Sequence, residues 1–254
     1  MIKYIYLVLT LMLVCFVVGN VVAEETSLLP IITLNDANKE PYTTMNNDGF
    51  LDVVLIEAFR RIGYQFKKVR LPPERGLLSA NEGIVDGEVN RIGGIEKIYT
   101  NLRRVPEKIR DSDFCVLSKN TDIKNHPKEL GQYVVGYIKG WKIYEKMMAG
   151  SEMTITANDP QQLFRLLKIN RIEVALYTCM QGFILAKENN IEGIKVLEPR
   201  LKQREMFVFL NKKHEDLLPK LSKALKNIKQ EGLYDTWKKA ILIPHMLPYE
   251  PHLK

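Results

Sequence analysis

Two series of alternating strand and helix patterns constrain the fold of this chain more than any other feature. The first series starts with a β-branched run at 29–35, continues with an amphipathic segment at 50–64 and an extended segment at 66–72, and ends with a short helix and a strand over 73–89. Apolar residues repeating every three to four positions predict helices, and short β-branched runs between turn residues predict strands. The first half of the chain therefore has the order β-α-β-α-β.

The same order recurs in the second half. Strands are expected at 132–138, 153–157 and 172–178, and the helices between them at 140–150 and 159–170. A further helix and a further strand follow before residue 200. Two such series indicate an α/β protein of two lobes, and parallel sheets of this kind bind ligands beyond the carboxyl ends of their strands.

Local signals support the ends of these helices. Gly63 follows the first long helix, where glycine commonly adopts the left-handed conformation that ends a helix. The helix at 159–170 begins with Asp159 as the N-cap, Pro160 at the first helical position, and Gln162 placed to complete a capping box.

Two apolar segments, 113–119 and 205–213, each follow a charged stretch, and we interpret them as the two crossings between the lobes. The last helices, expected within 214–241, then pack back on lobe one, and the residues after Pro244 are expected to form a loose end. The expected boundaries are 24–111 with 206–254 for lobe one and 112–205 for lobe two.

Residues 1–23 have the pattern of a cleaved secretory signal peptide. Lys3 precedes a short apolar run, and Val21 and Ala23 occupy the −3 and −1 positions of a small-residue cleavage site. The run is shorter than the ~20 apolar residues of a membrane-spanning helix. We expect a soluble periplasmic protein that begins directly after Ala23. A lipid anchor on Cys15 is the alternative, but the neighbours of this cysteine do not fit a lipobox.

The net charge and the positions of the histidines indicate which binding partners to expect. Removing Lys3 from the net charge of +7 for the whole chain leaves +6. A basic balance can indicate nucleic-acid binding, but here the signs alternate along the chain and the protein is expected to be exported, so we expect no nucleic-acid partner. The four histidines are far apart and form no pair at helical spacing. We therefore expect no metal and no cofactor.

Two cysteines remain after the leader, Cys115 and Cys179. In an oxidising compartment they can pair if the fold brings them together, which the sequence alone does not decide. Neither has a neighbouring His or Lys that would favour a reactive thiolate. A buried or disulfide-bonded role is favoured over a nucleophile.

Three segments carry a resemblance to a known family. These are NKEPYTTMNNDGFLDVVLIEAFRRIGY at 38–64, LSANEGIVDGEV at 78–89 and KALKNIKQEGLYDTWKKAI at 223–241. In this order and spacing they resemble the periplasmic solute-binding proteins of the amino-acid-binding type, family 3. The resemblance implies a two-lobed α/β fold of class II, with two interlobe crossings, a central cleft and no catalytic residues.

The stretch VDGEVNRIGGIEKIYTNLRRVP at 85–106 is the strongest candidate for a wall of that cleft. It lacks the Gly-Lys-Ser/Thr ending of a phosphate loop. In the family, the segment after Val-Asp-Gly lines the cleft, which implies that Glu88 and Arg91 lie near the ligand. A planar guanidinium suits a carboxylate. Glu88 could accept from an ammonium group or pair with Arg91.

Tyr42 and Arg75 are the other candidates on lobe one. The ring of Tyr42 could stack on a ligand, or it could be a partly buried loop aromatic. Arg75 lies at the start of a helix near the cleft edge, where it could make a bidentate contact with a carboxylate, or it could be solvated.

On lobe two, the backbone amides of Gly140 and Trp141 start a helix and could hold an anion. Tyr177 and Thr178 end a strand that points at the cleft, and their hydroxyls could contact the ligand. The alternatives are lobe packing for Trp141 and internal hydrogen bonds for the two hydroxyls.

The chain departs from the family at two positions. It lacks the Thr-x-x-Arg element that holds an α-carboxylate, and Tyr177 and Thr178 stand where an Asp holds the α-ammonium. The expected ligand is a small polar solute, carboxylate-bearing or amino-acid-like, captured by a monomer for an ABC-type importer or a sensor. The alternatives are a dehydratase-like enzyme using Glu88 as general acid or base, or a partner-binding protein with a degenerate pocket.

Overall fold

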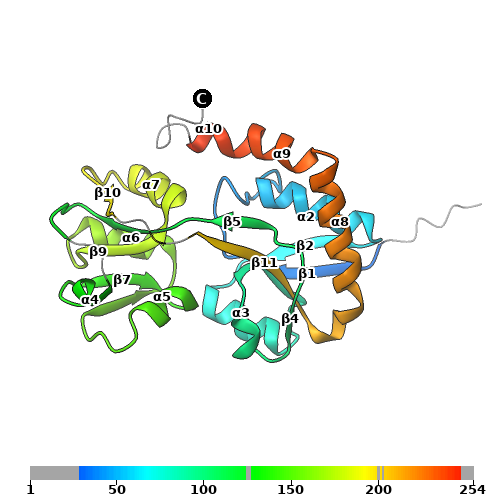
Figure 1. Cartoon of the computed structure of the whole chain (residues 1–254), viewed down its shortest axis with the longest axis horizontal. Helices are drawn as coiled ribbons and strands as arrows, with labels where there is room; N and C mark the ends of the chain where they lie inside the picture. The colour runs from blue at the N-terminus through cyan, green and yellow to red at the C-terminus, as the bar shows by residue number, and fades with distance from the viewer. Residues whose placement is uncertain (1–28, 124–126, 199–200, 202, 247–254) are drawn as a thin grey trace, which may run out of the picture.

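The computed structural model describes residues 29–123, 127–198, 201 and 203–246. The expected signal peptide and Cys15 lie outside the described residues. Two separate sheets, each covered by helices, lie side by side along the longest axis of the molecule (Figure 1). The two-lobed α/β architecture expected from the sequence is therefore confirmed. Within the described ranges no helix is long and apolar enough to cross a membrane.

Lobe one is built on a six-stranded sheet in the order β2-β1-β3-β11-β4, with β5 paired to β11. β1 is parallel to β2 and β3, whereas β11 runs antiparallel to β3, β4 and β5. The strands are β1 (Ile31–Asn35), β2 (Gln65–Val69), β3 (Gly87–Ile92), β4 (Leu102–Arg104), β5 (Arg110–Ser112) and β11 (Arg204–Asn211).

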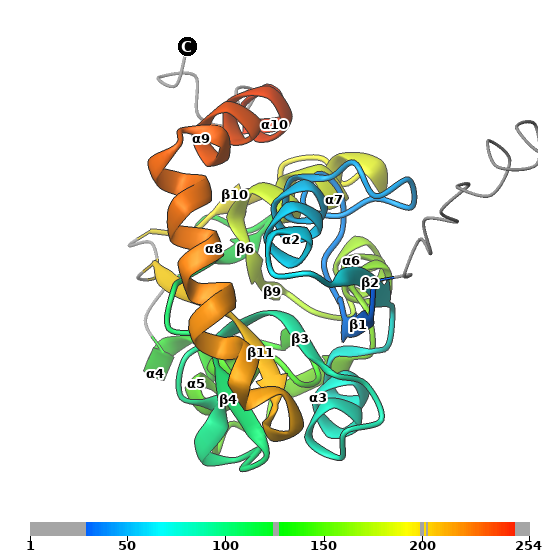
Figure 2. The same ribbon diagram turned by 90° about the vertical axis from the view of Figure 1, so that its right-hand side faces the viewer.

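Helices cover both faces of this sheet (Figure 2). On β11, Val208 and Leu210 belong to the core that also contains residues of α2 and α8, whereas Phe207 and Phe209 belong to the core with residues of α3. This alternation follows from the two-residue period of a strand. The helices are α2 (Phe50–Arg61), α3 (Pro73–Asn81) and α8 (Leu218–Gln230).

Lobe two is built on a five-stranded sheet in the order β10-β6-β9-β7-β8. β9 is parallel to β7 and antiparallel to β6. The strands are β6 (Phe114–Ser118), β7 (Val135–Ile138), β8 (Thr154–Ala157), β9 (Val174–Thr178) and β10 (Lys195–Val196). The helices are α4 (Pro127–Leu130), α5 (Lys142–Met147), α6 (Pro160–Lys168) and α7 (Cys179–Glu188).

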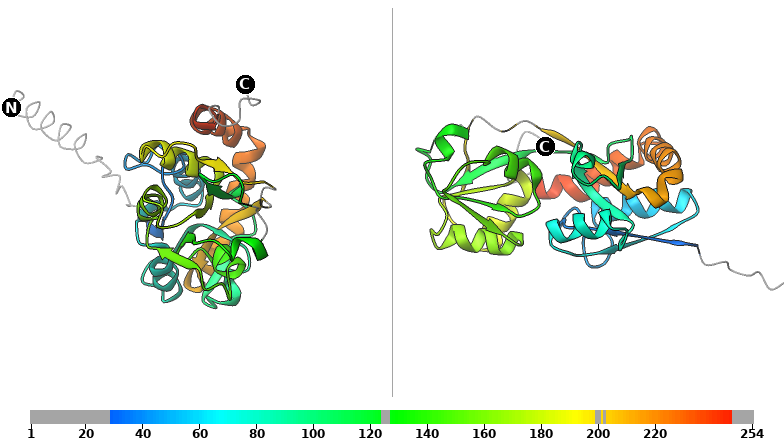
Figure 3. Two further views of the ribbon diagram at one scale, coloured as in Figure 1. Left: turned by 90° about the vertical axis from the view of Figure 1, so that its left-hand side faces the viewer. Right: turned by 90° about the horizontal axis from the view of Figure 1, so that it is seen from below.

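The crossings differ from the sequence-based expectation. The segments 113–119 and 205–213 contain β6 and β11, which are strands inside the two sheets and not connections between them. Every residue of β6 is buried, so its apolar run reflects a central strand covered on both faces. The chain leaves lobe one at Asp113, between β5 and β6, and returns between β10 and β11 (Figure 3).

The signals at Gly63 and at the N-cap Asp159 are confirmed, whereas the expected capping box is not formed, because Gln162 accepts from the amide of the residue before the N-cap. Gly63 has φ +80° directly after α2. The Asp159 carboxylate accepts a hydrogen bond from the Gln162 amide (2.7 Å), and the Gln162 side chain accepts one from the Asn158 amide (2.8 Å). The expected loose end after Pro244 is wrong for its first two residues, because α10 (Ile243–Met246) continues the C-terminal helices α9 (Leu233–Trp237) and η4 (Lys238–Leu242).

Cys115 and Cys179 form a disulfide, with their Cα atoms 5.1 Å apart. The bond joins β6 to the first residue of α7, and both elements belong to lobe two. It therefore fixes the start of α7 against the sheet.

Candidate functional site

Two cavities lie between the lobes, and both contain side chains from each lobe. The small cavity has a volume of about 60 Å³ and lies among α3, β3 and the start of α5. The large cavity has a volume of about 420 Å³ and lies among the loop after β1, α7 and the C-terminal helices. Arg110, Ser112 and Thr178 line both cavities. These three residues therefore form the boundary between them.

The predicted pair Glu88 and Arg91 lies in the wall of the small cavity, on β3. Arg91 Nε donates to Glu88 Oε2 (2.8 Å) and Nη2 donates to the Pro73 carbonyl (2.9 Å). Asn35 Nδ2 donates to Glu88 Oε1 (2.9 Å), and α3 can lie over this bond because Gly76 has no Cβ, which would be 1.9 Å from Asn35 Nδ2. The ion pair is thus already satisfied within lobe one.

Burial shifts the pKa of Glu88, the carboxyl group of this pair. Glu88 is 1% exposed, and its burial raises the pKa of the carboxyl group, while the charge of Arg91 opposes that rise. An ionised carboxylate that is buried destabilises the fold unless a cation pairs with it, so Glu88 depends on Arg91.

The backbone amides at the start of α5 donate to acceptors within lobe two. The Gly140 amide donates to Glu145 Oε1 (2.7 Å), and the Trp141 amide donates to the Ile138 carbonyl (3.1 Å). The Trp141 ring stacks on the ring of Tyr177 at 4.8 Å, and Tyr177 is buried in the core of lobe two. Both amides considered for anion binding are therefore occupied by protein acceptors.

An ion pair joins the two lobes beside the small cavity. Lys142 Nζ lies 2.7 Å from Glu74 Oε2 on α3 and 2.8 Å from Glu145 Oε2. Burial lowers the pKa of Lys142, but its hydrogen bonds to Glu145 and Glu74 outweigh burial, so the pKa is raised overall. The lysine is thus held charged between the lobes.

Two further contacts bring the lobes together. A Cβ on Gly140 would lie 2.4 Å from the Glu74 amide nitrogen, so the backbone of lobe two approaches α3 at a distance that only glycine allows. Gln181 Nε2, on α7, donates to the Lys39 carbonyl of lobe one (2.9 Å). The structure therefore shows lobes in direct contact on the side of the small cavity.

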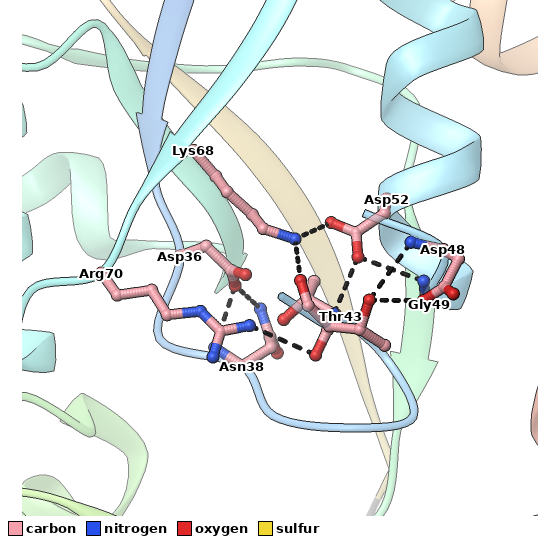
Figure 4. Close-up of polar contacts among 9 residues, drawn as sticks. Asp36, Asn38, Thr43, Asp48, Gly49, Asp52, Lys68 and Arg70 are labelled. Carbon is pink, nitrogen blue, oxygen red and sulfur yellow. Dashed lines mark hydrogen bonds and ion pairs between the residues drawn. The ribbon is translucent and has the colours of Figure 1, made fainter. Parts of the chain in front are cut away.

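The loop between β1 and α2 supplies Asn38 to the small cavity and Tyr42 to the large cavity. Figure 4 shows the polar contacts that fix this loop. The Asp52 carboxylate is fully buried, accepts from the Thr44 amide (2.8 Å) and pairs with Lys68 from β2. A buried ion pair thus anchors the loop to the sheet, which fixes where Tyr42 lies.

Arg110 and Ser112 are the site residues that the sequence interpretation missed. Arg110 is 5% exposed, lies over the Tyr42 ring at 4.0 Å, and donates from Nη1 to the Asp111 carbonyl (3.1 Å). Its Nε and the Ser112 hydroxyl are buried without a hydrogen-bond partner in the described part of the chain. Buried polar atoms are nearly always paired, and both residues line the cavities, so these unpaired donors indicate a place for a bound acceptor.

The structure distributes the predicted site residues over three places. Thr178 lies at both cavities, and its hydroxyl donates to Gln181 Oε1 (3.2 Å). Arg75 is exposed on α3 and lines neither cavity. Tyr42 lines the large cavity and Tyr177 lies in a core. The residues that the structure brings together at the small cavity are Glu88, Arg91, Gly140, Trp141 and Thr178.

The described residues contain no group of three or more His, Cys, Asp or Glu side chains that could hold a metal ion. The chemistry available between the lobes is hydrogen bonding, ion pairing and ring stacking. That set of contacts is suited to recognising a small molecule by its shape and charge.

Comparison with known sequences shows a distant relative. No protein-family model matches the chain. An uncharacterized protein from Shewanella oneidensis is 23% identical over 234 residues, which cover 85% of this chain and 88% of the relative.

Solved structures resemble the chain over most of its length. A histidine kinase sensor domain with similarity to periplasmic binding proteins has a TM-score of 0.74 at 14% identity, covering 84% of this chain and 96% of that one. The ligand-binding core of GluR0 from Nostoc punctiforme, in complex with L-glutamate, has a TM-score of 0.71 at 14% identity, covering 84% and 99%. The arginine-, lysine-, histidine-binding protein ArtJ from Geobacillus stearothermophilus has a TM-score of 0.71 at 16% identity, covering 84% and 95%. The chain has the two-lobed class II fold of the amino-acid-binding periplasmic proteins.

Proposed function

We propose that this protein is an exported receptor that holds a small carboxylate-bearing solute between its two lobes and delivers it to a membrane permease or a sensor. The fold supports solute binding, because the structures with this fold include amino-acid-binding proteins and a sensor domain. Fold alone does not assign a ligand, so the ligand class is argued from the site.

The observation that carries the proposal is the pair of unpaired donors on β5. Arg110 Nε and Ser112 Oγ are buried between the lobes without partners in the described residues, and they lie directly before the chain crosses to lobe two. A buried charged donor is costly unless an acceptor reaches it. A solute carboxylate accepts from both groups, and a charge-assisted hydrogen bond of this type contributes about 1.5–3 kcal/mol.

The proposal also includes a periplasmic location and a division of the chain into two lobes. The disulfide between Cys115 and Cys179 supports an oxidising compartment such as the periplasm. We propose cleavage after Ala23. The proposed lobes keep the boundaries expected from the sequence, 24–111 with 206–254 and 112–205, except at the junctions: Ser112 pairs with Arg204 in the sheet of lobe one, so lobe two is proposed to span 113–203.

The predicted residues of the small cavity then take a supporting role in this proposal. Glu88 and Arg91 pair with each other and form the wall beneath α3. Lys142 and Glu74 hold the lobes together on that side. The direct contact with the solute is assigned to Arg110, Ser112 and Thr178.

A thermal-shift screen of small carboxylates, amino acids and their amides tests the proposal. A solute at a hundredfold excess over its Kd stabilises the folded protein by ~2.7 kcal/mol. For a chain of this size that corresponds to a rise in melting temperature of roughly 5–11 °C. Carboxylates are expected to produce this rise, and the matching amides much less of it.

The matched variants are Arg110→Gln and Arg165→Gln. Arg165 is exposed on α6 and lines neither cavity, so its substitution is expected to leave binding unchanged. Arg110→Gln is expected to weaken carboxylate binding by about tenfold to a hundred-and-fiftyfold. Arg110→Lys keeps the charge and is expected to recover part of the loss. The proposal fails if no carboxylate in the screen stabilises the wild-type protein.

A further inference from the structure

We infer that the carbon skeleton of the solute lies in the large cavity, between α7 and the C-terminal helices, and that the solute is an aromatic or branched aliphatic acid without an ammonium group. This inference rests on the proposed function and deepens it. It assigns a ligand class and a location that differs from the small cavity, where the predicted residues gather.

The two cavities differ in volume, and only one is large enough for an organic solute. Ligand sites in proteins have volumes of about 300–1,000 Å³. The large cavity, at about 420 Å³, lies within that range. The small cavity, at about 60 Å³, has room for a few water molecules. With the lobes in the contact seen here, an organic solute fits only the large one of these two.

The walls of the large cavity match an apolar skeleton. Aromatic rings and flexible apolar side chains reach it from both lobes and from the C-terminal helices. Aromatic and methionine side chains offer large contact areas that adapt to an apolar ligand. These side chains include Tyr42, Phe50, Met180, Tyr234, Leu242 and Met246.

The charges around the large cavity favour an anion. Arg110 is buried and keeps a free Nε donor among the described residues, whereas Lys108 and Lys229 are already paired with Asp111 and Glu107. The carboxylate of a solute therefore has one buried cationic group to contact, at the boundary with the small cavity.

In the described part of the chain, the same walls contain no buried carboxylate that could pair with an ammonium group. The three carboxylates that line the large cavity, Asp111, Asp113 and Asp235, are all exposed to solvent. An exposed carboxylate contributes little to binding a cation, because water and salt screen it. An acid without an ammonium group therefore suits the cavity better than an α-amino acid.

The C-terminal helices cover this cavity. In Figures 1 and 3 they extend from lobe one across to lobe two, and α10 contacts α7. Tyr234 on α9, Leu242 on η4 and Met246 on α10 face the cavity. A solute bound there contacts both lobes and these helices at once, and such contacts favour the closed arrangement.

Binding of phenylacetate, with phenethyl alcohol as its uncharged match and L-glutamate as a polar acid, tests the inference by calorimetric titration. Met180→Trp adds bulk to a half-buried position of α7 that lines only the large cavity. Ile143→Trp is the matched variant, at a half-buried position of α5 that lines only the small cavity. Met246→Trp provides a second obstruction of the large cavity, from α10.

The expected result is that wild-type protein and Ile143→Trp bind phenylacetate with Kd values within about twofold of each other. Met180→Trp and Met246→Trp are expected to lose about tenfold or more, at unchanged circular dichroism, and the alcohol and L-glutamate are expected to bind wild-type protein at least about tenfold more weakly than phenylacetate. If Ile143→Trp loses binding and both large-cavity variants keep it, the solute lies in the small cavity and the inference is wrong, while the proposed function stands. If L-glutamate binds better than phenylacetate, the assigned ligand class is wrong. If wild-type protein binds no carboxylate, the proposed function itself is wrong.

Discussion

Arg91→Ala should destabilise the unliganded protein, because the substitution leaves Glu88 without its cationic partner. Arg91 Nε donates to Glu88 Oε2 at 2.8 Å, and Glu88 is 1% exposed, so its carboxylate is poorly hydrated in the folded protein. Among the described residues, only the side-chain amide of Asn35 still donates to the carboxylate. Removing one partner of a buried ion pair costs about 3–5 kcal/mol. For a chain of this size the melting temperature should fall by roughly 6–20 °C.

The pH dependence of this loss has a definite sign. Burial raises the pKa of Glu88, and the nearby Arg91 opposes that rise, so its removal raises the pKa further. A carboxyl group whose pKa is higher in the folded state binds its proton more tightly there than in the unfolded state. Its contribution to stability is present below the unfolded pKa of about 4.3 and is lost as the pH rises towards the folded pKa. The deficit of Arg91→Ala should therefore be larger at pH 8 than at pH 5.

Urea unfolding of wild type and variants at both pH values measures this effect. The exposed Arg104→Ala serves as the arginine control, and its stability should change little. The double variant Glu88→Gln with Arg91→Met removes both charges and should regain much of the loss. A wild-type-like stability of Arg91→Ala at pH 8 would refute the reasoning and would leave Arg91 free to act as the solute contact that the sequence predicted.

Three other perturbations have expected outcomes. Asp52→Asn removes the anchor of the β1–α2 loop and should cost about 3–5 kcal/mol in urea unfolding, whereas the exposed Asp48→Asn should cost much less. Reduction of the disulfide at Cys115, which closes a loop of 64 residues, should lower the free energy of unfolding by up to ~4 kcal/mol; equal stability with and without reductant would contradict this. Burial raises the pKa of Glu74, but its contacts with Lys142 outweigh burial and lower the pKa overall, so the interlobe ion pair should persist above about pH 4.5 and be lost as the pH falls through the lowered pKa. Small-angle scattering should show a larger radius of gyration for the wild-type protein at pH 3 than at pH 7. Glu74→Gln should show the larger radius already at pH 7. Radii equal to that of the wild-type protein at pH 7 in both cases would contradict this prediction.

Most of the fold could be predicted from the sequence, because its signals are local. The alternating strand and helix periods fix the two series of elements, and the caps at Gly63 and Asp159 depend only on neighbouring residues. The expected lobe boundaries at 112 and 206 lie close to the observed crossing points, but two strands were interpreted as the connections, because a buried central strand and an apolar connection have the same composition. β6 pairs with β9, more than fifty residues away, and no local pattern encodes that pairing.

The candidate site was predicted only in part. Glu88 and Arg91 do lie at a cavity between the lobes, but the sequence left open whether they bind a solute or each other. Residues three apart on a regular strand point to opposite faces, and the register shift between β3 and β11 at this point allows the two side chains to meet. Arg110 was missed because it resembles an ordinary charged residue in a polar stretch. Its position over Tyr42, which comes from a distant loop, depends on the tertiary fold.

A crystal structure of the protein with the most stabilising carboxylate of the screen tests whether Arg110 and Ser112 hold the solute. We expect electron density for the solute between the lobes, with a carboxylate oxygen about 2.7–3.2 Å from Arg110 Nε and the Ser112 hydroxyl donating to the same group. A solute bound outside the interlobe space, or bound between the lobes with Arg110 Nε still unpaired, would contradict it.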